Sequence, residues 1–355
     1  MKIGILTFHR AHNYGAMLQA YGLFAYLKTL GHEVNVIDYA PSIFKKGYRR
    51  SIPAIPRNPI NICKTIAKEP FLHNDRVKRY DAFDGFIHSA LDLYPYNEGF
   101  DGNEFDLIFI GSDQVWNKHC IRALDKVYWG EALKCKIASY AASMAWYRPS
   151  DNELPLIQNY LNRFSHVSVR EKDAADYLRT IISKPVEVVC DPTLLLQAKD
   201  WENICKPIPE KKKYLLCYNL VDDMECKQVA ETIAKEKGLK EINLVGSASM
   251  RNPKGSLVTA GPCEFLSYFK HAEYVVTSSF HGTVFSLIFK KQFLSVTPSK
   301  FAGRASYLLK TVGLEERMQI PSDIKNIPFC NYDDVDKRLS QFIASSKEFI
   351  VKCLS

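Results

Sequence analysis

Apolar and polar residues alternate along the chain in two different periods. Short, continuous apolar runs predict buried strands, and segments in which apolar residues recur every three or four positions predict helices. The first strand is predicted over Ile3–Phe8 and the first helix over Ala16–Leu30. Gly31 ends that helix, and Val34–Tyr39 is the next strand. The chain therefore begins with a strand–helix–strand unit.

The same alternation continues almost to the end of the chain. Further strands are predicted over Phe105–Ile110, Lys136–Ala142, His166–Val169, Val186–Cys190, Tyr214–Asn219, Ile242–Val245, Glu273–Thr277 and Phe293–Val296. Helices are predicted from about Asn152, over Glu171–Ile182, Met224–Lys237, Cys263–His271, through Val284–Ile288, over Arg304–Val312 and in the last twenty residues. The pattern restarts after the polar, Pro-containing stretch 192–209, so it indicates two Rossmann-like, doubly wound α/β domains that face a cleft. We expect them over residues 1–195 and 196–330, followed by a C-terminal helix over 331–355.

Length and composition agree with this organisation. The 355 residues suffice for two domains with separate cores, and the apolar, charged and aromatic fractions (46%, 24% and 12%) are those of a globular protein. A net charge of +8 suits anionic substrates or an anionic membrane surface and is too diffuse to predict nucleic-acid binding. None of the ten cysteines forms a C-x-x-C pair, and no apolar run reaches the roughly 20 residues of a membrane span. We therefore expect a cytoplasmic protein.

One segment departs from the alternation. Residues 44–68 combine cations, among them Lys45, Lys46, Arg49, Arg50 and Arg57, with tyrosine and isoleucine residues and are interrupted by three prolines. A solvated excursion between two elements has this composition, and so does a basic, partly apolar surface that rests on anionic lipid head groups. Both interpretations remain open at the level of sequence, and the second adds a peripheral contact with the inner face of a membrane.

Two polar clusters lie at strand ends in the first half of the chain. The first follows the first strand and includes His9, Asn13 and Tyr14. It can wrap a ligand, although it lacks the G-x-G-x-x-G spacing of a dinucleotide site. The second, GSDQVWN, follows the strand Phe105–Ile110: Asp113 can accept a proton from a hydroxyl, and a tryptophan offers a flat apolar face for a sugar. From these two clusters we expect an acceptor site made of His9, Asn13, Tyr14, Gln114, Trp116 and Asn117. The alternative for each cluster is a capped turn with packing side chains.

Two further clusters suit an anion. Arg170 ends a strand where a helix begins, and its planar guanidinium can bind a carboxylate or phosphate through two bonds. His281 stands where the strand Glu273–Thr277 passes into a helix, beside Ser279 and Gly282, whose helix start presents free N–H groups to anions. The cations Lys300 and Arg304 follow a strand later. A surface ion pair for Arg170 and a structural role for His281 are the alternatives. No Cys/His set has zinc spacing, and neither a Walker loop nor a G-x-S-x-G turn is present, so we expect no metal and no cofactor.

Several of these segments together resemble the polysaccharide pyruvyl transferase family. They are, in chain order, ILTFHRAHNYGAMLQAYGLFAYLKTLGHEVNVIDY, FIGSDQVWN, SVREKDAADYL, VCDPTLLL, GPCEFLSYFKHAEYVVTSSFHGTVFSLIF and GRASYLL. The resemblance covers nearly the whole chain except about 44–96 and the last thirty residues. It implies a GT-B-like fold and an enzyme without metal or nucleotide-sugar donor. It further implies that pyruvate passes from phosphoenolpyruvate to two hydroxyls of one sugar, as in capsule or exopolysaccharide synthesis.

The resemblance also assigns roles to particular residues. His281 matches the catalytic histidine of the family, Arg170 matches its donor-binding arginine, and Lys300 falls near a third donor residue. Some members of the family have a run of glycines in the donor loop where this chain has Gly111–Gln114. The donor-binding roles of that loop are therefore not assigned to these positions. A positioned histidine is the commonest general acid, which suits protonation of an enol ether. We expect Asp113 to receive the acceptor proton and Arg304 to join the donor site.

Two rival functions remain at this stage. A glycosyltransferase of the same architecture would bind a nucleotide sugar through a ribose-binding carboxylate, for which Glu264 is the nearby candidate. A glycan-binding protein of capsule assembly would bind sugar and release no phosphate. The acceptor sugar, and whether it is lipid-linked, cannot be derived from the sequence.

Overall fold

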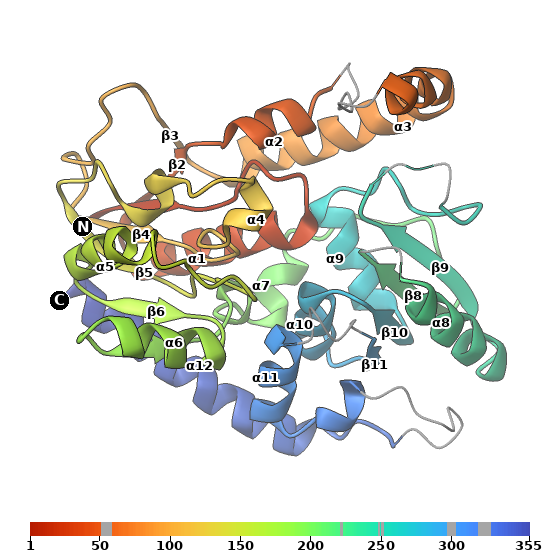
Figure 1. Ribbon diagram of the computed structural model, residues 1–355. Helices are drawn as coiled ribbons and strands as arrows, with labels where there is room; N and C mark the ends of the chain where they lie inside the picture. The colour runs from red at the N-terminus through yellow and green to blue at the C-terminus, as the bar shows by residue number, and fades with distance from the viewer. Residues whose placement is uncertain (51–58, 221–222, 248, 250–251, 297–302, 319–327) are drawn as a thin grey trace.

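The computed structural model describes the chain except residues 51–58, 221–222, 248, 250–251, 297–302 and 319–327, and describes residues 59–68 only as helix. Two parallel sheets form its frame, each with helices on its faces (Figure 1). The first has the strand order β3-β2-β1-β4-β5, and the second has the order β11-β10-β8-β9. The α/β architecture with two parallel sheets, predicted from the alternating pattern, is thus confirmed.

The first sheet is buried on both faces, as a parallel sheet must be when helices cover both sides. β4, for example, is four consecutive buried residues, LIFI. Its strands are β1 (Lys2–Leu6), β2 (Glu33–Asp38), β3 (Leu93–Pro95), β4 (Leu107–Ile110) and β5 (Lys136–Ser139). A two-stranded parallel pair, β6 (Val167–Val169) and β7 (Val186–Val188), extends this half of the molecule. Its helices are α1 (Tyr14–Thr29), α2 (Ser42–Gly47), α3 (Pro59–Ala90), α4 (Lys118–Ile121), α5 (Leu154–Arg163) and α6 (Lys172–Ile181), with a 3-10 turn over Lys126–Trp129.

The second sheet repeats the scheme with shorter connections. Its strands are β8 (Tyr214–Asn219), β9 (Lys240–Val245), β10 (Tyr274–Thr277) and β11 (Gln292–Ser295). Its helices are α7 (Ala198–Glu202), α8 (Met224–Glu236), α9 (Pro262–His271), α10 (Phe280–Ile288) and α11 (Gly303–Val312), with 3-10 turns over Pro192–Leu194 and Glu315–Met318. Gly282 lets α10 lie close to β10, because a methyl group there would overlap Thr277. The strand-to-helix turn that carries His281 is therefore packed tightly.

The last helix, α12 (Tyr332–Leu354), returns beneath the first half of the molecule (Figure 1). It contacts α11 at its beginning, and nearer its end Ser346 Oγ accepts a hydrogen bond of 2.8 Å from the Cys190 N–H. The Phe349 ring packs edge-on against His166. One apolar cluster includes Ile3 and Val36 from the first sheet together with Leu216 and Val275 from the second. The two sheets and α12 consequently share a continuous core.

Part of the segment 44–68 is more regular than expected. α2 lies within its first residues, and α3 begins at Pro59 and runs for 32 residues with Pro70 inside it. Parts of the segment are therefore helical, but none of the residues of α2 is buried, so the solvated interpretation is not contradicted there. Residues 51–58 lie outside the described part. Over the described residues, the helices all fall short of the length or apolar character needed to cross a membrane.

Candidate active site

A cavity of about 260 Å³ lies at the carboxyl ends of both sheets. In the first sheet it lies between β1 and β4. The chain passes from β1 to β2 on one side and continues with β4 on the other, so the strand order reverses here. Ligands bind at such topological switch points in open α/β sheets. Three loops and one helix contribute its polar lining: Asn13 after β1, Asp113 and Gln114 after β4, Ser279 and His281 after β10, and Arg304 on α11. Four of the polar clusters singled out in the sequence thus meet around this site, with Arg170 directly behind it.

His281 occupies the first turn of α10 and is 6% exposed. Ser279 caps that helix, its hydroxyl accepting from the Gly282 N–H at 3.5 Å. Across the cleft the imidazole lies against Gly15 in the first turn of α1, where a methyl group would overlap the ring. Its Nε2 is 3.4 Å from Oδ2 of Asp191. The histidine is therefore held between two helix starts and one carboxylate.

Asp191 connects the histidine to the arginine. Its Oδ2 accepts a 2.6 Å bond from Arg170 Nη1, and its Oδ1 accepts from the N–H and hydroxyl of Thr193 at 3.1 and 2.7 Å. Burial favours the neutral acid, but the charges of His281 and Arg170 outweigh it and hold the pKa of Asp191 well below its ordinary value. The buried carboxylate is thus an anion that can stabilise a positive charge on the imidazole.

Arg170 follows β6 and is 3% exposed. Burial opposes its charge, yet Asp191, Glu171 and Asp113 raise its pKa above the ordinary value. The carboxylates of Asp113 and Glu171 are each 3.8 Å away, beyond hydrogen-bond distance. Among the described residues, Nε and Nη2 have no hydrogen-bond partner. Two donors of a permanently charged group are thus buried without a hydrogen-bond partner, close to Asp113 of the cavity lining.

Phe280 contacts this arginine and a second one. The guanidinium carbon of Arg170 lies 4.6 Å from the centre of the Phe280 ring, and that of Arg304 lies 5.6 Å from it. Burial and the charge of Arg170 lower the pKa of Arg304. Two cations so close repel each other, and an anion bound beside them relieves that repulsion. Lys300, the third expected cation, lies outside the described residues.

Asp113 completes the cavity on the side of the first sheet. Its backbone has a φ of 64°, and its Oδ1 accepts from the Gln114 N–H at 2.8 Å. The side chain is 13% exposed and lines the same cavity as His281. Gln114 beside it is fixed by a 2.9 Å bond from the Asn117 side-chain amide. A carboxylate and an imidazole thus face one small space.

Four of the expected acceptor residues are not part of the cavity lining. His9 is fully buried and bonds Asp38 at 3.0 Å, and Tyr14 donates to the Ala260 carbonyl at 2.7 Å. Trp116 stacks on Trp129 with ring centres 4.8 Å apart, and Asn117 caps α4. The expectation that Trp116 offers a face to a sugar is wrong, because that ring is 1% exposed in the core. His9, Tyr14 and Asn117 position the loops rather than line the cavity.

Asn13 lines the cavity and also caps α1, accepting from the Gly15 N–H at 2.9 Å. Sequence reasoning missed Asp191, Phe280 and Gly15. Asp191 follows the predicted strand Val186–Cys190 directly, so its position at a strand end was a usable signal. The contact of Gly15 with His281 joins two segments that are 266 positions apart, and no local pattern predicts it.

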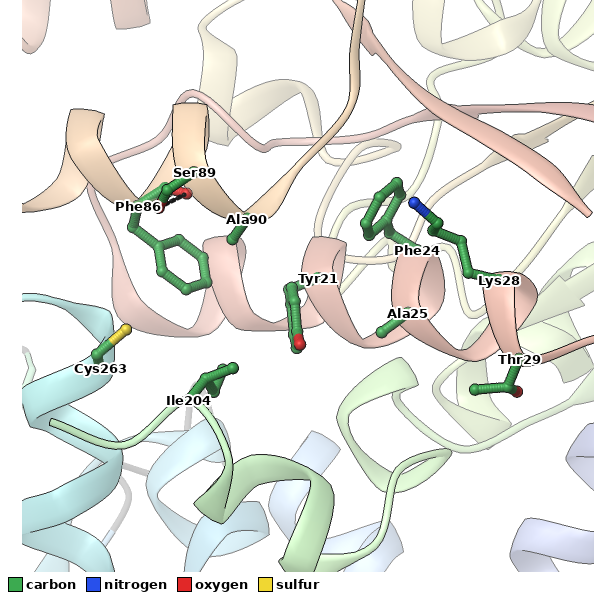
Figure 2. A pocket seen from close by; sticks show the side chains of 10 residues that line it. All are labelled: Tyr21, Phe24, Ala25, Lys28, Thr29, Phe86, Ser89, Ala90, Ile204 and Cys263. Atoms are coloured by element: carbon green, nitrogen blue, oxygen red, sulfur yellow. Dashed lines mark hydrogen bonds between the residues drawn. The ribbon is translucent and has the colours of Figure 1, made fainter.

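A larger hollow of about 650 Å³ lies beside α1 and is shown in Figure 2. Tyr21, Phe24, Phe86 and Ile204 give it an apolar lining. Its one lysine, Lys28, is paired with Asp92 at 2.8 Å. Convergent charged groups are lacking there, so the smaller cavity is the candidate active site. Within the described part of the chain, no three His, Cys, Asp or Glu residues cluster as a metal site would require.

Comparisons with known proteins identify the family and the fold. A family model described as polysaccharide pyruvyl transferase matches residues 13–300. No curated protein matches the chain. Among solved structures, a UDP-N-acetylglucosamine 2-epimerase is similar with a TM-score of 0.51 and 11% identity over 99% of this chain and 95% of the other. A putative UDP-N-acetylglucosamine 2-epimerase from Listeria monocytogenes has a TM-score of 0.50 and 9% identity over 98% and 89%. At such identities the likeness concerns the fold alone, and it confirms the GT-B-like arrangement.

Proposed function

Because this chain belongs to the polysaccharide pyruvyl transferase family, we propose that it transfers pyruvate from phosphoenolpyruvate to two hydroxyls of one sugar. The product is a cyclic ketal, and phosphate is released. The observation that carries the proposal is the convergence of His281, Asp113 and Arg304 on one small cavity, with Arg170 directly behind it. The sugar belongs to a polysaccharide or a lipid-linked oligosaccharide.

The cationic side of the cavity suits the donor. Phosphoenolpyruvate carries a carboxylate and a phosphate, and guanidinium groups bind both through paired hydrogen bonds. Arg170 has two donors without a hydrogen-bond partner, and Arg304 also lies against the Phe280 ring. Ser279 and Gly282 shape the start of α10, whose N–H groups favour anions. Lys300 keeps its proposed donor role from the family resemblance.

The acid–base chemistry follows from the facing side chains. His281 donates a proton to the terminal carbon of the enol ether, and Asp191 stabilises the imidazolium before transfer. One sugar hydroxyl bonds to the central carbon and gives its proton to Asp113. The bond to phosphate then breaks, the second hydroxyl bonds to the same carbon, and its proton leaves with phosphate. The proton held by Asp113 returns to His281 through solvent, so each turnover consumes one diol and one phosphoenolpyruvate.

The acceptor side is formed by Asp113, Gln114 and Asn13, which line the cavity, with Asp113 3.8 Å from Arg170. His9, Tyr14 and Asn117 act on the acceptor indirectly, by fixing the loops that carry those residues. The nine cysteines whose side chains are described are free thiols, as in a reducing compartment. A cytoplasmic site of action, with reversible contact of the basic surface with a membrane, is part of the proposal.

A nucleotide-sugar glycosyltransferase is the main rival. Its candidate ribose-binding carboxylate, Glu264, instead accepts from the Gly261 N–H at 3.1 Å and caps α9. Thermal-shift titrations with phosphoenolpyruvate and with nucleotide sugars separate the two, since a ligand stabilises only a protein that binds it.

The direct test of the proposal is phosphate release from phosphoenolpyruvate in the presence of a panel of sugar acceptors. We expect release that depends on the acceptor. Stabilisation by nucleotide sugars alone, without release on any acceptor, would favour the rival. Binding of sugars without either effect would favour a glycan-binding protein.

A further inference from the structure

A second cavity of about 350 Å³ lies beside the candidate active site, at the carboxyl ends of β1 and β2. Phe44 lines both cavities, so its side chain forms part of the wall between them. The loop 7–13 faces the active site through Phe8 and Asn13 and faces the second cavity through Arg10 and His12. A molecule extending out of the active site past Phe44 would therefore enter this second cavity.

One side of the second cavity is aromatic. The His12 ring lies 4.9 Å from the ring of Tyr48, nearly parallel to it, and 4.9 Å from that of Tyr80. Tyr48 is 37% exposed, which is much for a large ring that lines a cavity. Burial and the charges of Arg79 and Arg10 lower the pKa of His12 to about 4, so this wall is neutral near pH 7. A neutral, partly exposed aromatic wall suits the C–H face of a sugar ring.

The same cavity is also lined by a fixed set of charged groups. Arg10 donates to both oxygens of Asp38 at 2.7 Å and lies 3.5 Å from Asp84. The two carboxylates remain 30% and 32% exposed, and a carboxylate oxygen accepts more than one hydrogen bond. Their geometry is set by Arg10 before any ligand arrives. Preorganised acceptors beside an aromatic wall are what the hydroxyls and ring face of a saccharide require.

The size of the active-site cavity explains why a second site is needed. Its volume of about 260 Å³ falls below the range of roughly 300–1,000 Å³ typical of small-molecule sites, and it has to hold both donor and reacting sugar. Further units of an oligosaccharide must lie outside it. We propose that the second cavity binds the sugar unit next to the reacting one, so that the enzyme prefers acceptors of at least two units. This inference rests on the proposed function and names the acceptor class of that site.

Calorimetric titration without phosphoenolpyruvate tests the subsite separately from catalysis. The probes are the methyl glycoside, the disaccharide and the tetrasaccharide of the glucose, galactose, mannose and N-acetylglucosamine series. We expect at least one disaccharide to bind about tenfold more tightly than its methyl glycoside, the gain of one good aromatic contact. Tyr48→Ala should remove that gain, and Tyr48→Phe should keep most of it.

Tyr177→Ala is the matched control, since Tyr177 is a half-buried surface tyrosine on α6 that packs under Arg148. It should leave the gain unchanged. If Tyr48→Ala does not fold, Tyr80→Ala takes its place. The subsite is overturned if the methyl glycoside and the disaccharide bind with equal affinity in every series. It is also overturned if the higher affinity for the disaccharide persists in both Tyr48→Ala and Tyr80→Ala. Phosphate release from phosphoenolpyruvate is measured separately, so failure of the subsite and failure of the proposed function give different results.

Discussion

At the scale of single residues, the buried carboxylate of Asp191 determines how the site is held together. It bonds Arg170 at 2.6 Å, approaches His281 at 3.4 Å and is itself fixed by Thr193. A buried cation that loses its partner destabilises a protein strongly, because desolvation is no longer compensated. Asp191 is thus expected to matter for stability as well as for the orientation of two proposed catalytic groups.

Asp191→Asn should lower the free energy of unfolding by about 3 kcal/mol, the cost of breaking a buried ion pair from one side. Urea unfolding followed by circular dichroism measures it. Asp176→Asn is the matched control, because Asp176 pairs with Lys172 and Arg179 on the exposed face of α6, where solvent screens the pairs and the substitution should change stability little. Similar small losses for both variants would show that Asp191 is not a buried charged partner.

His12 gives a prediction about pH. Burial, Arg79 and Arg10 lower its pKa from 6.5 to about 4 in the folded protein. The unfolded chain therefore binds more protons between these values, and the contribution of His12 to stability is full above pH 6.5 and is lost as the pH falls towards 4. Protonation of His12 over this range should lower the free energy of unfolding by about 2 kcal/mol, a value reduced because the side chain is partly exposed.

His12→Phe keeps the ring between Tyr48 and Phe83 and removes the titrating group. Urea unfolding at pH 7.5 and 5.0 should show a smaller difference for this variant than for the wild type. An identical pH dependence of both proteins would contradict the assignment.

At this scale the sequence indicated the residues that gather at the cavity better than their surroundings. His281, Arg170 and Asp113 follow apolar strands directly, and parallel strands bring their carboxyl ends to one edge of a sheet. Trp116 follows the same strand as Asp113, yet its ring turns into the core against Trp129. Which way a loop side chain points depends on tertiary packing, and sequence position did not determine it.

At the scale of elements, the contact between α1 and α10 brings the two halves of the site together. Gly15 in the first turn of α1 lies directly against the His281 ring, and any larger side chain would overlap it. The close approach of two helix starts therefore depends on one missing methyl group.

Gly15→Ala should displace the imidazole and reduce turnover by about tenfold or more. A displacement of about 1 Å in a catalytic group can lower the rate by a factor of about 10². Initial rates of phosphate release measure this effect. Gly85→Ala is the control, because Gly85 lies within α3 with open space around it, and alanine there should if anything stabilise the helix. Unchanged rates for Gly15→Ala would mean that His281 has another position in the working enzyme.

The elements themselves were predictable where one period dominated. The predicted strands and helices around β1, β4, β8 and β10 correspond closely to those observed. α3 was missed because charged residues and Pro70 interrupt its apolar pattern. The second half of α3 is held by tertiary contacts. Arg79 is buried, donates to the Tyr14 hydroxyl at 2.9 Å and lies over the Phe83 ring. Such contacts between distant segments override a weak local pattern.

At the scale of the whole molecule, the basic surface of Lys45, Lys46, Arg49 and Arg50 lies next to the second cavity, which Lys45 lines. Arg50 is paired with Asp81, and its neighbours in this group are exposed. A membrane-bound acceptor would reach the active site past this surface. The relation between the two is a hypothesis that vesicle binding can test.

Replacing these four cations with glutamine should reduce co-sedimentation with vesicles that contain phosphatidylserine, because each cation near an anionic surface contributes roughly 1 kcal/mol. Wild-type binding should weaken with salt, as the Debye length falls from about 10 Å at 0.1 M to about 3 Å at 1 M. The control replaces Lys211, Lys212, Lys213 and Lys235, which are equally exposed on the second half of the chain. If the wild-type protein does not co-sediment with such vesicles at low salt, the proposed contact with a membrane is excluded.

Protonation of phosphoenolpyruvate by His281 can be tested with a single pair of proteins. Wild type and His281→Gln are compared for binding of phosphoenolpyruvate by calorimetry and for acceptor-dependent phosphate release. We predict nearly equal donor affinity and a loss of turnover on the order of 10² or more, as for a missing general acid. Phosphate release by His281→Gln at nearly the wild-type rate would contradict the account.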